Sequence, residues 1–60
     1  MNTTEISALA RQLYDARGAK AIAEAARRSE QLAQAGDSEQ AKIWERVEAV
    51  LREMSGPRQT

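Results

Sequence analysis

The side chains that most often act as general bases, nucleophiles or metal ligands are scarce in this sequence, because histidine and cysteine are both absent. Carboxylate pairs such as Glu45 and Glu48 remain. They fall outside the apolar sector of a helix, so we expect them to face water rather than a cleft that would suit acid–base chemistry. The sequence therefore predicts a protein that is not an enzyme, with no catalytic, cofactor-binding or metal-ligating residues and no evident small-molecule substrate.

Basic side chains are the second set with a possible chemistry, the binding of phosphate. The candidates for a nucleic-acid-binding face are Arg11, Arg17, Lys20, Arg27 and Arg28. The whole chain, however, has nine basic and nine acidic residues, whereas nucleic-acid binders usually carry a basic excess. Glu24 precedes the Arg27-Arg28 pair at the spacing of helix-surface ion pairs, and Glu48 precedes Arg52 in the same way. Nucleic-acid binding is therefore the alternative function, not the main one.

Bulky apolar side chains are the third set, and they would form either a core or an interface. They are Ile6, Leu9, Leu13, Tyr14, Ile43, Trp44, Val47, Val50, Leu51 and Met54. The single tryptophan could anchor a partner, because tryptophan often dominates interface energetics, or it could fill the core. Sixty residues are close to the lower limit for independent folding. We therefore expect a marginal monomer, or one stabilised by a protein partner or by self-association.

Residues 38–54 contain most of these bulky apolar side chains. At about 100° per residue from Ile43, the apolar side chains of this stretch fall within an arc of about 120°. Asp37 can cap the first turn, Gly36 suits the left-handed residue that ends a preceding helix, and Gly56 suits the end of this one. The pattern predicts an amphipathic helix with one buried face.

Gly18 decides how the N-terminal half is organised. The apolar face of residues 3–17 contains Ile6 and Leu13, whereas that of residues 19–35 is turned by about 120–130°. A straight helix against one partner would keep its face, and glycine suits a helix end, so we expect a break at Gly18. The expected apolar face of the second helix consists of Ile22, Ala25, Ala26, Ser29, Leu32 and Ala33.

The sequence thus predicts an all-α fold, a small antiparallel three-helix bundle with helices at about 3–17, 19–35 and 38–54. We expect a single domain over residues 1–60, with a frayed tail at 55–60. The alternative is a long-helix hairpin that dimerises, in which residues 3–35 form one rod packed against the last helix.

Gly36-Asp37-Ser38-Glu39-Gln40-Ala41 resembles the turn between the paired helices of a tetratricopeptide repeat, where a Gly-Asp pair precedes an alanine at the helix crossing. The resemblance covers about 20–25 residues, and the sequence lacks the spacing and the three or so units of an array of such repeats. It implies a tight helical hairpin. More loosely, Trp44 and the Leu13-Tyr14 pair followed by Gly18 make the chain similar to short helical proteins common in bacteria, which implies no particular function.

The main functional prediction is a small non-catalytic helical module for protein–protein interaction, with an accessory or regulatory role. No apolar stretch has the length of a membrane span, and the start lacks the pattern of a signal peptide, so we expect a cytoplasmic protein without a membrane partner. Its partner would be another protein or a second copy of itself, in a homo-oligomer.

Overall fold

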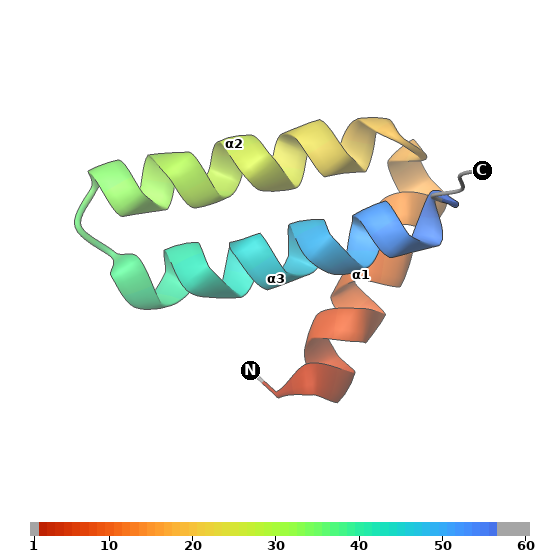
Figure 1. The fold of residues 1–60 in the computed structure, drawn as a ribbon, viewed down its shortest axis with the longest axis horizontal. Coiled ribbons are helices and arrows are strands. Elements are labelled where there is room, and N and C mark those ends of the chain that lie inside the picture. Colours follow the sequence, from red (N-terminus) through yellow and green to blue (C-terminus); the bar gives the residue numbers. More distant parts are fainter. Residues whose placement is uncertain (1, 57–60) are drawn as a thin grey trace.

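The computed structural model describes residues 2–56, which form three α-helices. They are α1 (Thr3–Arg17), α2 (Lys20–Gln34) and α3 (Ser38–Met54), as Figure 1 shows. The predicted all-α fold and its division into three helices are confirmed, and α2 is one residue shorter at each end than expected. Of the tail predicted to fray, residues 57–60 lie outside the described residues.

The turn between α2 and α3 is held by backbone hydrogen bonds around Gly36, whose φ is 86°. The Asp37 N–H donates to the Leu32 carbonyl at 2.9 Å, and the Gly36 N–H donates to the Ala33 carbonyl at 3.1 Å. These two bonds make a Schellman motif. The Asp37 carboxylate then accepts the Gln40 N–H at 3.2 Å. One aspartate thus closes α2 and caps α3, which places the two helices side by side and antiparallel (Figure 1).

The connection between α1 and α2 consists of Gly18 and Ala19, so the break predicted at Gly18 is confirmed and no continuous rod forms. Gly18 has φ 61° and ψ −142°, and its N–H donates to the Tyr14 carbonyl. No side chain caps the N-terminus of α2, so backbone carbonyls of the turn accept the first N–H groups of the helix. The Ala21 N–H donates to the Gly18 carbonyl at 3.0 Å, and the Ile22 N–H to the Ala19 carbonyl at 3.1 Å.

Substitution of Gly18 tests this break. Its dihedrals are the mirror image of the polyproline II region, which L-residues avoid and D-residues favour. A Cβ at this position would meet nothing within 4 Å, so the effect of a substitution comes from the backbone conformation alone. Gly18→Ala should lower the free energy of unfolding by about 1–3 kcal/mol, whereas D-alanine at this position should raise it by about 0.4–1 kcal/mol.

Urea unfolding of chemically synthesised chains, followed by circular dichroism, measures both changes. In a continuous helix the L-alanine variant would instead be more stable, because alanine exceeds glycine in helix propensity by about 1 kcal/mol. The sign of the Gly18→Ala effect therefore distinguishes the break from the rod.

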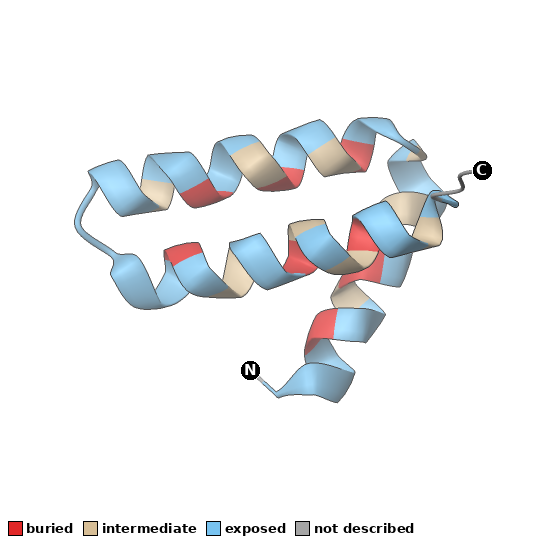
Figure 2. Cartoon of the chain, viewed as in Figure 1, coloured by how far each residue is buried: buried red, intermediate tan, exposed pale blue. Residues whose placement is uncertain are grey.

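Small side chains form the contact between α2 and α3, which is the most extensive of the three helix pairs. Ala21, Ala25 and Ser29 are the buried residues of α2, and they recur every fourth position (Figure 2). The Ser29 hydroxyl is satisfied locally by donating to the Ala26 carbonyl at 3.1 Å. This spacing puts a row of small groups against α3, so the two helices can approach closely.

The predicted face of α2 was partly wrong. Ala33 is exposed and Ala21, which was not included, is fully buried, whereas Ile22, Ala26 and Leu32 are partly buried. Alanines occur on several sides of this helix, so the two large side chains, Ile22 and Leu32, determined the predicted direction of its apolar face. In the structure these two large side chains flank the close contact instead of filling it.

Helix α1 crosses the α2–α3 hairpin obliquely (Figure 1) and packs mainly against α3. The resulting core combines residues of all three helices, namely Ile6, Ala10, Ala21, Ala25, Val47 and Leu51. Leu51 and Val47 are its largest fully buried side chains. Most bulky side chains therefore lie around the core rather than inside it.

Candidate functional site

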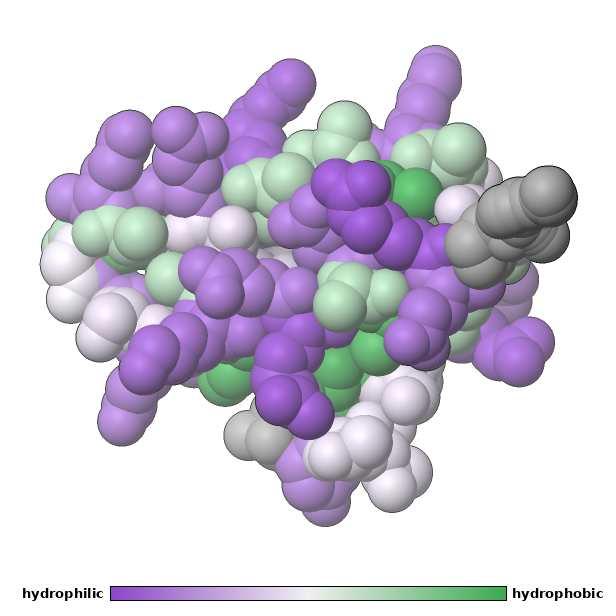
Figure 3. Space-filling view, viewed as in Figure 1, coloured by the Kyte–Doolittle hydropathy of each residue, from purple (hydrophilic) through white to green (hydrophobic). Residues whose placement is uncertain are grey.

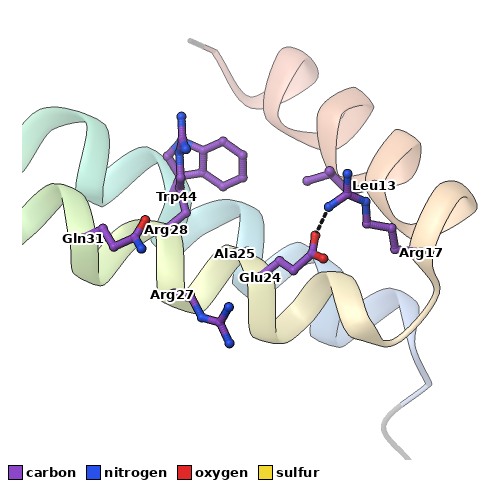
Figure 4. A pocket seen from close by; sticks show the side chains of 8 residues that line it. All are labelled: Leu13, Arg17, Glu24, Ala25, Arg27, Arg28, Gln31 and Trp44. Carbon is purple, nitrogen blue, oxygen red and sulfur yellow. Dashed lines mark hydrogen bonds and ion pairs between the residues drawn. The ribbon is translucent and has the colours of Figure 1, made fainter.

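An open groove of about 370 Å³ lies where the three helices meet. Its apolar floor comprises Leu13 of α1, Ala25 of α2 and Trp44 of α3. Figure 4 shows the Leu13 side chain directed toward the Trp44 ring. The polar rim is made by Arg17, Glu24, Arg27, Arg28 and Gln31. We call this the Trp44 groove.

The Trp44 ring makes a cation–π contact with Arg28 of α2. The Arg28 guanidinium carbon lies 5.6 Å from the centroid of the Trp44 ring, within the range at which the positive charge is attracted to the ring face. Trp44 is only partly buried, because its ring reaches beyond the close α2–α3 contact. The groove therefore presents a partly exposed indole ring with an arginine over one face.

Glu24 pairs with Arg17, so one ion pair bridges α1 and α2 across the Gly18 turn (Figure 4). The sequence had suggested that Glu24 would pair with Arg27 and Arg28, and this was wrong. The turn brings Arg17 next to Glu24, while Arg28 lies over Trp44. The rim consequently carries three guanidinium groups and one carboxylate, a local excess of positive charge in a chain with no net charge.

The expected pair of Glu48 and Arg52 is confirmed on the surface of α3. The Arg52 Nη2 and Nε atoms donate to Glu48 Oε2 at 2.6 Å and 3.0 Å. The Arg52 side chain is 64% exposed, so this pair contributes little to stability. The Glu48 side chain is only 20% exposed, so the expectation that it faces water is only partly met.

The structure divides the predicted nucleic-acid-binding set. Arg17, Arg27 and Arg28 border the Trp44 groove, whereas Lys20 lies exposed outside it. Arg11 borders a second depression with Tyr14, Asp15 and Met54, on the other side of α1. Three of the five basic residues thus share one site.

The candidate apolar set is likewise divided. Ile6, Val47 and Leu51 are buried in the core. The other members surround it as partly buried side chains: Leu9, Leu13, Tyr14, Ile43, Trp44, Val50 and Met54. Figure 3 shows small areas of hydrophobic surface bordered by hydrophilic side chains on one face of the molecule.

Sequence reasoning did not select Ala25 or Gln31 as site residues. Ala25 is fully buried and yet reaches the floor of the groove. Its small side chain leaves room for the Trp44 ring at the surface. Neither residue type has a spacing that would mark it, so only the packing of the helices identifies them.

No family model matches the sequence, and no curated protein or solved structure is similar to it. Among the described residues, no three side chains of the types histidine, cysteine, aspartate and glutamate are grouped so that they could hold a metal ion. None of the three helices is both long and apolar enough to cross a membrane.

Proposed function

We propose that this protein is a small non-catalytic helical interaction module that binds a partner protein through the Trp44 groove. The observation that carries the proposal is a single tryptophan, partly exposed and with Arg28 over its ring, between Leu13 and Ala25. Aromatic and arginine side chains are enriched at the energetic centres of protein interfaces. The role would be accessory or regulatory, and it would be exercised in the cytoplasm.

The distribution of apolar side chains supports this proposal. Of the ten candidate apolar side chains, only Ile6, Val47 and Leu51 are buried, and the other seven stay partly exposed around the core. A partner that covered Trp44 and Leu13 would remove more apolar surface from water and would stabilise the fold by mass action. Self-association through the same surface would act in the same way.

Binding of single-stranded nucleic acid is the second candidate function. The clustering of Arg17, Arg27 and Arg28 around an aromatic ring favours it, because bases stack on aromatic side chains while arginines contact phosphates. The absence of net charge on the chain favours a protein partner instead.

Site-specific photo-crosslinking in the cells that produce the protein tests the interaction. Benzoylphenylalanine replaces the exposed Gln31 at the rim of the groove, and in the control it replaces Lys42, which is exposed on α3 and about 160° from Trp44 around the helix. We expect a discrete protein adduct from position 31 and a much weaker one from position 42. Equal adducts from both positions, or none from position 31, would contradict the proposal.

A further inference from the structure

We infer that the occupant of the Trp44 groove is an acidic segment of a partner protein that presents a large apolar side chain between its carboxylates. This inference rests on the proposed function and specifies the chemistry of the partner. It follows from three features of the groove: the sign of its rim charge, the nature of its floor, and the side chains that this chain could offer to a second copy of itself.

The rim selects negative charge. Glu24 is paired with Arg17, so the carboxylate of the rim is already neutralised by one guanidinium. Arg28, at 5.6 Å from the ring centroid of Trp44, and Arg27, farther out on α2, supply the remaining positive charge. Both belong to an exposed part of the helix, so an incoming carboxylate can reach them without displacing a buried group. Charge complementarity of this kind guides association and excludes basic partners.

The floor selects an apolar anchor. Leu13, Ala25 and Trp44 give a hydrophobic surface inside an open groove of about 370 Å³, which is large enough for one or two side chains of the size of leucine or phenylalanine. A free phosphate or a purely acidic peptide would leave this floor uncovered. An amphipathic acidic segment satisfies both the floor and the rim.

A second copy of this chain fits less well. Among residues 2–56, every exposed apolar side chain is an alanine, and the larger ones are at least partly buried against their own core. The described part of the chain therefore offers no leucine or aromatic side chain in a fully exposed position as an anchor. Within residues 2–56 the anchor is therefore missing, and we assign it to another protein.

Intrinsic fluorescence tests this inference, because Trp44 is the only tryptophan of the chain and lies in the groove. The probes are a short amphipathic peptide of glutamate and leucine, the same peptide with lysine for glutamate, and the same peptide with serine for leucine. We expect the glutamate–leucine peptide to shift Trp44 emission and to bind at least about tenfold more tightly than the other two. Its binding should weaken as salt is added.

Charge reversal in the protein supplies the matched comparison. Arg28→Glu should weaken binding of the glutamate–leucine peptide by about tenfold, and Arg27→Glu should weaken it less, since Arg27 extends away from Trp44 (Figure 4). Arg46→Glu is the control: it changes the net charge equally but lies about 160° around α3 from Trp44. Circular dichroism verifies that each variant is folded.

Several results would overturn the inference. They are equal binding of the lysine or the serine peptide, an equal effect of Arg46→Glu, tighter binding of an oligothymidylate than of the acidic peptide, and, as the last, a change of Trp44 emission on dilution of the protein alone. The last would assign the groove to a second copy. If the peptides fail while the adduct at position 31 forms, the inference is wrong and the proposed function stands. If no adduct forms at position 31, the proposed function itself fails.

Discussion

Leu51→Ala is expected to abolish the folded state at room temperature or reduce it to a minor population. Leu51 is the largest side chain with no exposure and belongs to the core shared by all three helices. Truncation of such a leucine costs about 2–5 kcal/mol, including the cavity that it leaves. A domain of this size rarely has more than about 3–5 kcal/mol of stability from its core.

Leu32→Ala is the matched control, because it removes the same atoms from a partly buried site outside the core cluster. Leu32→Ala should lower the free energy of unfolding clearly less than Leu51→Ala does. Circular dichroism at increasing urea concentrations measures both variants, with a stabilising osmolyte added if Leu51→Ala is unfolded in buffer. If both variants lost a similar amount of unfolding free energy, the burial of Leu51 would not be what holds the helices together.

Ala25→Leu is expected to lower the free energy of unfolding by about 1–3 kcal/mol. Ala25 has no exposure and lies in the middle of the small-residue row of α2. A larger side chain would push α2 away from α3 and would also enter the Trp44 groove. Alanine and leucine have similar helix propensities, so the loss reports on packing between the helices.

Ala23→Leu makes the same replacement at an exposed position of α2 and should change the free energy of unfolding by less than about 0.5 kcal/mol. Thermal unfolding and the fluorescence emission of Trp44 are measured for both variants and compare the effect of the buried substitution with that of the exposed one. We expect a lower melting temperature and altered emission for Ala25→Leu alone. An unchanged melting temperature for Ala25→Leu would mean that the close contact at this position is not required.

Local chemistry made the helix ends predictable. Asn2, Gly18, Gly36 and Asp37 occur at the positions that the structure uses for caps and turns, and the Asn2 carboxamide accepts the Glu5 N–H at 2.9 Å. These interactions involve residues only three to five positions apart, so the sequence contains everything that they need. The predicted start of α3 and the predicted end of α1 followed from Asp37 and Gly18.

The face of α2 was harder to predict, for a physical reason. Its buried row consists of two alanines and a serine, which have little hydrophobic contrast with the alanines on other sides of the helix. The periodicity method depends on that contrast. Ala33 was therefore placed wrongly in the interface and Ala21 was overlooked.

The sequence by itself determined three helices, the ends of α1 and α3, and the absence of histidine and cysteine. Only the tertiary structure decided that Arg17 pairs with Glu24, that Arg28 lies over Trp44, and that Leu13 completes the groove. These contacts join different helices, and their geometry depends on how closely α2 approaches α3 and how obliquely α1 crosses them. Spacing along the chain does not encode those two quantities, because they result from packing of the whole core.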